Sequence, residues 1–505
     1  MNEIQSEILF FPLLLLLFIY SSCLILVFFY ALAQFNLLIN YLSEKNNSKK
    51  LIKWDFKKKN EVPFVTIQLP IYNELYVIKR LLKSIIKINY PPEKLEIQVL
   101  DDSDDNSIEL TKKLINKIKS TGIDIIHLKR KNRIGYKAGA LKIGLERSKG
   151  DFIAIFDSDF IPNPDFLIKT IPYFKNKIVG MVQTKWEHIN RNFSILTKVQ
   201  AFGLDGHFSL EQVGRNFKNH FINFNGTAGV WRKSTIIDAG NWEGDTLTED
   251  LDLSYRAQLK NWKFIYLEKI ETPAELPVAV SAVRSQQYRW NKGGAENFQK
   301  NIFNVLKSSK INFKTKLHAF VHLLNSTMFL NIFIIGFLSV PMLYVKNKWI
   351  ELDWYFTINS LFILSTLIFY ICYWFLHKQK YGSGLINIFD FTIRFITFYS
   401  IMIAFSFHNS IAVIKGHLGI KSPFIRTPKF NISDDGKNTL NQNKYLEKSI
   451  TIYTLIEAVI SLYFLFGLLS AFSVVEKGDF SLFPFHLLLF LGFGFITIKS
   501  FIESK

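Results

Sequence analysis

Carboxylates recur in short clusters along the first half of this chain. Asp157-Ser-Asp159 is an Asp-x-Asp triplet, and the stretches Asp101–Asp105 and Asp245–Asp252 carry further acidic side chains. Two carboxylates two residues apart can both reach one Mg²⁺ or Mn²⁺ and leave coordination positions open for phosphate oxygens. Because Asp and Ser also favour turns and helix starts, an isolated triplet is more often structural. The triplet therefore predicts a metal site only if other polar clusters lie beside it.

Apolar strands and amphipathic helices alternate around these clusters, so the fold class can be predicted. The expected strands are 64–69, 95–100, 123–128 and 152–156, and the expected helices are 74–89, 106–120 and 136–148. Such alternation is typical of a parallel sheet covered by helices on both faces. We therefore expect an α/β domain with a mostly parallel sheet.

Each expected strand is followed directly by polar residues. Pro70–Glu74 follows the first, Asp101–Asp105 the second, Arg130–Arg133 and then Lys137 the third, and Asp157–Asp159 the fourth. Ligands of open α/β sheets bind outside the carboxyl ends of the strands, so the four clusters should converge on one crevice. Neither G-x-G-x-x-G nor G-x-x-x-x-G-K-[ST] is present, which argues against a dinucleotide site or a P-loop.

A second acidic cluster also has a purely structural interpretation. Thr246-x-x-Glu249 has the spacing of a capping box, in which the threonine and glutamate side chains bond the first backbone amides of a helix. Asp250 and Asp252 would then lie in the first turn, where negative charge suits the helix dipole. Neither effect requires catalysis.

Tryptophans accompany the later polar residues. Gln286, Arg289 and Trp290 are spaced i, i+3 and i+4, which places them on one face of a helix. In isolation, an Arg beside a Trp indicates ordinary packing or a cation–π pair. Trp186 and Trp231 could present flat apolar faces to a ligand or could belong to the core.

Composition limits the class of protein. The chain has 505 residues, of which 49% are hydrophobic, and 49 Phe exclude intrinsic disorder. Cys23 and Cys372 are the two cysteines, and both lie in apolar runs, which excludes a disulfide scaffold and a Cys-based zinc site. The formal charge of +19 suits a nucleic acid or a membrane surface, so the location of the basic residues must decide.

The basic residues lie beside apolar segments. Residues 8–33 carry no charged side chain. A helix of this length can cross a bilayer, and the run is too long for the apolar part of a typical signal peptide. Seven lysines lie between 45 and 59, so the positive-inside rule predicts an external N-terminus and a cytoplasmic location for the residues from 45 onward. Only Trp54 and Phe56 interleave with these lysines, so we expect a lipid bilayer as partner and no nucleic acid.

Five further apolar segments lie near 320–345, 354–376, 391–414, 450–472 and 481–501. The segment 391–414 has basic residues on both flanks, and if both flanks are cytoplasmic it cannot cross. We expect five spans and one interfacial helix, with six spans as the alternative. Six spans would place residues 415–448 outside.

Eight motifs resemble, in order, the family-2 glycosyltransferases of the cellulose synthase superfamily, especially β-glucan and mannan synthases. They are LPIYNE (69–74), VLDDSDD (99–105), KAGAL (137–141), DSD (157–159), VQTKW (182–186), FNGTAGVWRK (224–233), DTLTEDLDLSYRAQLKNWKF (245–264) and QQYRW (286–290). The resemblance covers about residues 62–300. It implies a nucleotide-sugar-binding domain of the GT-A type and inversion at the anomeric carbon.

The resemblance also implies a role for each matching residue. Tyr72, Glu74 and Asp102 would hold uracil and ribose, Lys137 would approach the diphosphate, and Asp157 with Asp159 would hold the metal, Mg²⁺ or Mn²⁺. Asp250 would be the general base, beside Glu249 in the substrate site, and Trp186 would contact substrate. Gln286, Arg289 and Trp290 would hold the leaving diphosphate and the acceptor sugar. Phe424–Lys429 looks similar to the family's gating loop but departs from it at Arg426 and Pro428.

The domain plan combines the apolar and basic segments with this resemblance. We expect an N-terminal transmembrane anchor at 1–40, a basic cytoplasmic linker at 41–62, a cytoplasmic GT-A domain at 63–310, and a membrane domain at 311–505. The last would contain an interfacial helix at about 385–414 and a gating loop at 421–430.

The expected enzyme is a processive, metal-dependent hexosyltransferase of the plasma membrane. It would build a β-linked polysaccharide acceptor on the cytoplasmic side with coupled export, with UDP-glucose favoured as the donor. A β-mannan synthase using GDP-mannose and a non-processive lipid hexosyltransferase are the alternatives. A non-catalytic scaffold is disfavoured, because Asp157, Asp159, Asp250 and Arg289 are all present.

Overall fold

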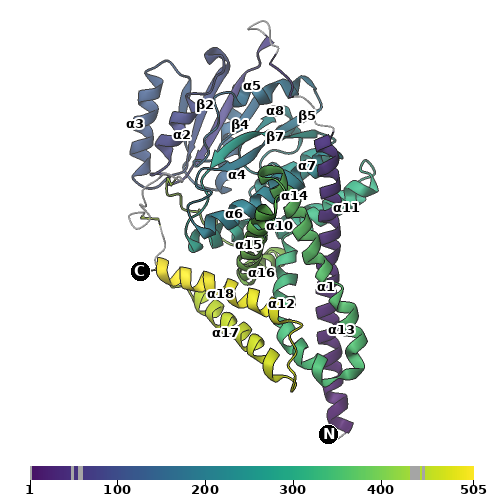
Figure 1. Cartoon of the computed structure of the whole chain (residues 1–505). Helices are drawn as coiled ribbons and strands as arrows, with labels where there is room; N and C mark the ends of the chain where they lie inside the picture. The colour runs from purple at the N-terminus through teal and green to yellow at the C-terminus, as the bar shows by residue number, and fades with distance from the viewer. Residues whose placement is uncertain (1–2, 47–50, 55–60, 433–443, 446–449, 505) are drawn as a thin grey trace.

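An α/β domain stands at one end of the molecule and a set of long helices at the other (Figure 1). The structure is a computed structural model that describes all residues except 1–2, 47–50, 55–60, 433–443, 446–449 and 505. Helix α1 (Glu3–Asn46) runs through the helical part and reaches the α/β domain with its C-terminal end. The predicted boundary at residue 40 therefore lies inside a helix, and part of the predicted linker lies outside the described residues.

Seven strands form one sheet in the order β3-β2-β1-β4-β6-β5-β7. They are β1 (Val65–Ile71), β2 (Leu95–Asp101), β3 (Ile125–Lys129), β4 (Phe152–Ile155), β5 (Val179–His188), β6 (Gly229–Arg232) and β7 (Lys263–Ala274). Strand β6 is antiparallel to β4 and β5, and every other neighbouring pair is parallel. The mostly parallel sheet is thus confirmed, and the four predicted strands begin and end within two residues of the observed ones.

Helices cover both faces of the sheet. They are α2 (Ile78–Ile85), α3 (Ser107–Lys119), α4 (Tyr136–Arg147), α5 (Phe166–Thr170), α6 (Ile195–Asp205), α7 (Gln212–Phe217), α8 (Lys233–Asp238), α9 (Glu249–Leu259) and α10 (Val280–Lys307), with a π-helical turn η4 (Gly206–Glu211) and 3₁₀ turns at Pro92–Lys94 and Ile171–Lys175. The predicted helix at 74–89 is shorter than expected. Asn73 has a positive φ of 56°, and residues 74–77 form a turn that brings Glu74 to the sheet edge.

The core joins the sheet to the long helices. Side chains alternate along each strand, so Ala154 packs on one face while Ile153 and Ile155 pack on the other. The second face also buries Leu37 of α1 and Cys372 of helix α14 (Ile363–Tyr381). The α/β domain and the C-terminal ends of these two helices therefore share one hydrophobic core.

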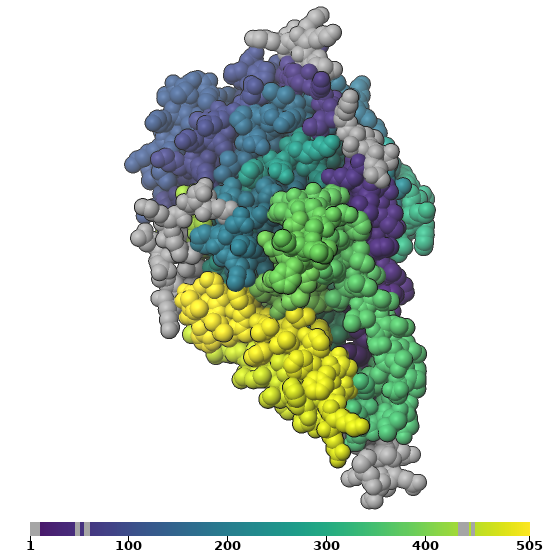
Figure 2. Space-filling view, in the orientation of Figure 1, coloured from purple at the N-terminus to yellow at the C-terminus, as the bar shows by residue number. Residues whose placement is uncertain are grey.

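The remaining helices are α11 (Phe313–Leu324), α12 (Thr327–Lys348), α13 (Asp353–Ser360), α14 (Ile363–Tyr381), α15 (Leu385–Ala404), α16 (Ser406–His417), α17 (Ile452–Ser473) and α18 (Phe483–Glu503), with a 3₁₀ turn at Ile350–Leu352. Among the described residues, six helical segments are long and apolar enough to cross a membrane. They are Phe11–Lys45, Thr327–Lys348, Ile350–Tyr381, Leu385–Ala404, Ile452–Ser473 and Phe483–Glu503. In Figure 2 the yellow pair α17–α18 stands beside the green helices below the α/β domain.

The segment predicted as one interfacial helix is two helices, α15 and α16, which meet at Phe405. Both of its flanks lie against the α/β domain. Before it, Tyr373 stacks on Phe202 with ring centroids 4.9 Å apart, and after it Arg426 bonds to Glu74. A segment that begins and ends beside the same domain crosses a bilayer an even number of times or not at all. This geometry agrees with the predicted placement of both flanks on one side.

A cysteine-labelling experiment tests this topology. Ser433, in the middle of the loop 415–448, lies outside the described residues, so the exposed Lys421 of the same loop is the better labelling position. In a Cys23→Ala, Cys372→Ala background, Lys421→Cys should resist an impermeant maleimide in intact cells and react after permeabilisation. Lys477→Cys, in the loop between α17 and α18, is the matched control and should react in intact cells. Ready labelling at position 421 would favour six spans.

Candidate active site

All twelve predicted site residues line one cavity of about 180 Å³ at the carboxyl edge of the sheet. They are Tyr72, Glu74, Asp102, Lys137, Asp157, Asp159, Trp186, Glu249, Asp250, Gln286, Arg289 and Trp290. They come from the ends of β1, β2 and β4, from β5 and from the helices α4, α9 and α10. The convergence predicted from four strand ends therefore extends to the two later clusters.

The Asp-x-Asp carboxylates each face a lysine. Lys137 Nζ lies 2.6 Å from Asp157 Oδ1 and also donates to the carbonyl of Gly226 at 2.9 Å. Lys429 Nζ lies 2.8 Å from Asp159 Oδ1. Two ammonium groups thus satisfy the carboxylates that were expected to hold a metal ion.

The charge of the lining suits a divalent cation. Seven carboxylates and five Lys or Arg side chains line the cavity, and two of the five, Arg426 and Lys429, belong to the loop 421–430. The lining therefore carries two surplus negative charges with the loop in place and four without it. Carboxylate oxygens are hard ligands of the kind that Mg²⁺ and Mn²⁺ prefer. Asp157 and Asp159 thus fit the predicted metal.

Asp250 lies in the first turn of α9, deep in the cavity wall. Its Oδ1 accepts a hydrogen bond from the backbone N–H of Leu251 at 2.9 Å. Burial, with a smaller effect from the Glu249 carboxylate, raises the pKa of Asp250 to about 7. A carboxylate whose pKa lies near the working pH is suited to general-base catalysis.

A glycine lets the neighbouring loop approach this carboxylate. Gly226 has a φ of 78°, and a Cβ at this position would lie 3.0 Å from Asp250 Oδ2. A side chain here would be strained and would crowd the carboxylate. The Gly226 carbonyl meanwhile holds Lys137, so this turn fixes the lysine relative to Asp250.

The predicted capping box is wrong. Helix α9 begins at Glu249 with Thr248 as its N-cap, and no side chain caps it. The reason is a tertiary contact, because Asn297 of α10 donates to Thr246 Oγ1 at 3.3 Å and to Thr248 Oγ1 at 3.0 Å. Glu249 is therefore free of a capping role and lines the cavity.

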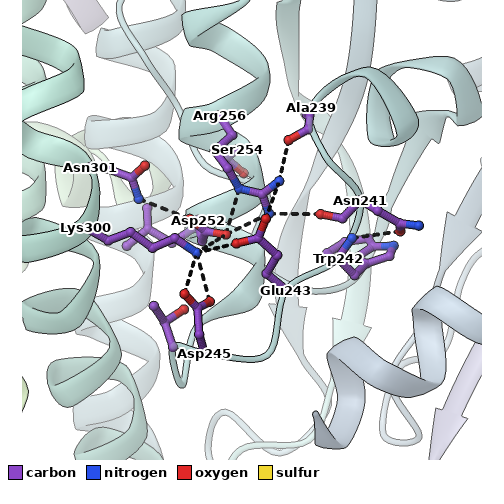
Figure 3. A network of polar contacts seen from close by, with 12 residues as sticks. Ala239, Asn241, Trp242, Glu243, Asp245, Asp252, Ser254, Arg256, Lys300 and Asn301 are labelled. Atoms are coloured by element: carbon purple, nitrogen blue, oxygen red, sulfur yellow. Dashed lines mark hydrogen bonds and ion pairs between the residues drawn. The ribbon is translucent and has the colours of Figure 1, made fainter. Parts of the chain in front are cut away.

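An ion-pair network ties α9 to α10 (Figure 3). Lys300 Nζ of α10 lies 2.7 Å from Glu243, 2.8 Å from Asp245 and 3.2 Å from Asp252, and Arg256 also pairs with Asp252. The three carboxylates lie close enough together to hold a metal ion, but Lys300 lies between them and Arg256 pairs with two of them. The network instead sets the position of the Asp250 motif relative to α10.

One side of the cavity holds an aromatic ring and a fixed carboxylate. The guanidinium of Arg133 stacks 3.4 Å above the Tyr72 ring, whose hydroxyl donates to Asp104 at 3.0 Å. Arg130 holds Asp102 with two hydrogen bonds, one of them 2.8 Å from Nε to Oδ1. A flat cation–aromatic pair beside an oriented carboxylate can receive a nucleobase and a ribose hydroxyl.

Helix α10 brings Gln286, Arg289 and Trp290 to the opposite wall, on one helical face as predicted. The cation–π partner of Arg289 is Phe424, with the guanidinium 4.8 Å from the ring centroid, and not Trp290. Arg289 Nη2 also donates to Thr427 Oγ1 at 3.1 Å. Trp290 keeps 36% of its surface exposed, so its face is open to a ligand.

The other two tryptophans separate into one site residue and one core residue. Trp186 lines the cavity, with its ring centroid 5.1 Å from that of Phe160. Trp231 is fully buried against Phe224 and Trp242, which excludes a sugar-facing role for it.

The loop 421–430 reaches into the cavity. Arg426 donates two hydrogen bonds to Glu74, of 3.0 Å and 2.6 Å, and Phe424 stacks on Tyr136 with centroids 5.4 Å apart. Arg426 is one of the two residues at which this loop departs from the family pattern, and it makes the pair with Glu74. The loop therefore occupies carboxylates that were expected to bind substrate and metal.

Sequence reasoning missed several lining residues, among them three polar side chains. His188 is buried and its pKa is lowered to about 4 by burial, Asn225 bonds to His207 at 2.9 Å, and Glu275 accepts from the N–H groups of Phe430 and Asn431. His188 ends β5 and Glu275 follows β7. Extending the strand assignment beyond residue 156 would have placed both at the same sheet edge.

Comparison with known proteins agrees with this geometry. Residues 63–293 match the family described as glycosyltransferase like family 2. The chain is similar to probable glucomannan 4-beta-mannosyltransferase 2 of Oryza sativa subsp. japonica, with 43% identity over 263 residues that cover 51% of this chain and 45% of that protein. It is 40% identical to glucomannan 4-beta-mannosyltransferase 2 of Arabidopsis thaliana over 261 residues, covering 51% and 49%. The chain thus matches about half the length of these curated relatives.

A solved structure shares the fold. The mannosyltransferase PcManGT from Pyrobaculum calidifontis, in complex with GDP-Man and Mn²⁺, aligns with a TM-score of 0.52 at 16% identity and covers 80% of this chain and 99% of that one. At this identity the likeness concerns the fold. The α/β domain of this chain is a family-2 glycosyltransferase, as its resemblance to the cellulose synthase superfamily predicted.

Proposed function

We propose that this chain is a membrane-integrated, inverting β-mannosyltransferase that extends a β-linked mannan or glucomannan from GDP-mannose. The similarity to glucomannan 4-beta-mannosyltransferases carries this proposal. The motifs alone favoured UDP-glucose, and the relatives do not support that donor. The motif residues do not distinguish the two donors, because Asp157, Asp159 and Arg289 would contact the diphosphate, which both donors share.

The site residues suit a single inverting displacement. Asp250 would accept the proton of the acceptor hydroxyl as that oxygen attacks the anomeric carbon, because its raised pKa makes it an effective base near neutral pH. Lys137 and Arg289 would stabilise the charge on the departing diphosphate. A divalent cation held by Asp157 and Asp159 would supply further positive charge there. Inversion needs one base on the face opposite the leaving group and no covalent carboxylate.

The loop 421–430 would have to change its contacts during this cycle. Arg426 holds Glu74 and Lys429 holds Asp159. A nucleotide and its cation would compete for these carboxylates, so donor binding would release both pairs. Arg426 and Lys429 could then approach the diphosphate from above the site.

We place the catalytic domain on the cytoplasmic side of the plasma membrane, with processive synthesis and export through the helical part. The lysines after α1 and the shared side of both flanks of α15–α16 support this orientation.

Product linkage analysis tests the donor. Purified full-length protein, given Mn²⁺ and an oligosaccharide primer, should convert GDP-mannose to an alkali-stable β-1,4-mannan and should turn over UDP-glucose at least about tenfold less efficiently. Synthesis of glucan from UDP-glucose alone would restore the glucan assignment. Transfer of one hexose to a lipid would favour the lipid hexosyltransferase instead.

A further inference from the structure

A second cavity, of about 290 Å³, lies where α1, α14 and α15 meet the α/β domain. It shares no lining residue with the active-site cavity. Its cationic side chains come from five different elements and the loop after β5. They are Lys45, Lys185, Arg191, Lys198, Lys380 and Arg394.

Most of these cations are balanced by a carboxylate, and two are not. The balanced ones form the pairs Lys45–Glu268 (2.8 Å), Lys185–Glu271 (3.2 Å), Arg191–Asp205 (2.7 Å) and Arg394–Asp390 (2.6 Å). Lys198 of α6 and Lys380 of α14 have no carboxylate within ion-pair distance in the described part of the chain. Even when Glu187, which also pairs with Arg191, is counted with the four carboxylates above, the cations remain in excess. The cavity is therefore suited to an anion.

The cavity lies where apolar helices end. Helix α1 and helix α14 both finish here, and the Tyr41 hydroxyl joins them by donating to Gln379 Oε1 at 2.6 Å. The candidate membrane segments Phe11–Lys45 and Ile350–Tyr381 end at this level. In Figure 2 the green surface of α14 and α15 meets the blue and teal surface of the α/β domain. Basic and aromatic side chains at the ends of apolar helices mark the headgroup layer of a bilayer.

An exposed apolar surface continues from the cavity. Helix α15 carries the cavity residue Arg394, and its preceding turns expose Leu385 (85%), Ile386 (85%), Phe389 (70%) and Ile393 (51%). A free anion would gain nothing from these side chains. A ligand that is anionic at one end and apolar at the other would satisfy both surfaces.

We propose that this cavity binds the phosphate of an anionic phospholipid, with Lys198 and Lys380 as its charged ligands and the acyl chains along α15. Because Lys198 belongs to the α/β domain and Lys380 to a membrane-segment helix, the lipid would bridge the two parts. The proposal does not depend on the identity of the sugar donor.

Lipid retention by the full-length protein tests the proposal. Wild type is placed in nanodiscs of phosphatidylcholine with or without a minor fraction of phosphatidylglycerol, and bound lipid is counted by native mass spectrometry. We expect wild type to retain phosphatidylglycerol and to unfold at a higher temperature with it. Lys198→Gln/Lys380→Gln should bind it about tenfold more weakly or worse. Retention equal to wild type by this variant would overturn the proposal.

The controls separate the site from general attraction. Lys112→Gln/Lys113→Gln removes the same charge from the exposed face of α3, far from the helical part, and should retain lipid like wild type. Inorganic phosphate in phosphatidylcholine discs should leave the unfolding temperature unchanged, and equal stabilisation by phosphate would overturn the lipid assignment. If the double variant unfolds early in neutral discs, the single variants are measured instead, and wild-type retention by both would overturn the proposal.

Discussion

Asp250→Asn should reduce turnover by about 10² to 10⁴ while leaving the affinity for GDP-mannose nearly unchanged. Asparagine keeps the shape of the side chain and can still accept the hydrogen bond from Leu251, but it cannot take a proton. The proposed contacts to the diphosphate lie on Lys137 and Arg289, so donor binding should survive. Turnover is measured by mannan formation and affinity by titration calorimetry with GDP-mannose.

The pH dependence gives a second readout of the same residue. The pKa of Asp250 is raised to about 7, and this carboxylate must be ionised to act as the proposed base. In wild type, kcat/KM should therefore fall about tenfold for each pH unit below 7 and level off above it. This fall in kcat/KM below pH 7 should be absent from the residual activity of Asp250→Asn.

Two neighbours serve as controls for Asp250→Asn. Asp245→Asn changes an exposed acid of the same motif that pairs with Lys300 and should keep most activity. Glu249→Gln should lie between the two, because Glu249 lines the cavity and has no capping role to lose. Near-normal mannan synthesis by Asp250→Asn would show that another group is the base.

Loss of the proposed metal-binding carboxylates should be almost as severe. Asp157→Asn/Asp159→Asn leaves no anionic ligand in the Asp-x-Asp triplet, and we expect turnover to fall by at least about 10² because a bound cation contributes several kcal/mol of charge stabilisation. Unlike Asp250→Asn, this variant should also lose the dependence of GDP-mannose binding on Mn²⁺. Calorimetry with and without Mn²⁺ measures this directly.

Chelation provides the matching test on wild type. Protein stripped with a chelator should be inactive and should recover with Mn²⁺ or Mg²⁺. Asp165→Asn is the control for the Asp157→Asn/Asp159→Asn variant, since Asp165 follows the same strand but pairs with Lys169 outside the cavity. Full activity in excess chelator would show that Asp157 and Asp159 hold no metal that the reaction needs. Their role would then be limited to the ion pairs with Lys137 and Lys429.

The sequence by itself determined the first four strands of the sheet and most of the residues that line the cavity. The strand at 152–156, for example, is apolar throughout, and burial of such a run on both faces leaves few alternatives to a parallel sheet. Asp102 directly follows β2 and Asp157 closely follows β4, and both strands are parallel neighbours of β1. Their side chains must therefore lie at the same edge of the sheet. Local pattern and motif spacing therefore sufficed for these residues.

The tertiary structure alone decided the features that depend on distant parts of the chain. The Thr246–Glu249 spacing fits a capping box, but Asn297 of α10 takes the threonine hydroxyls, and a local pattern cannot reveal that competitor. Likewise, Arg426 reaches Glu74 across 352 positions of sequence. Such contacts are set by how the long helices pack against the α/β domain. This packing brings together charged residues whose pairing no local sequence pattern indicates.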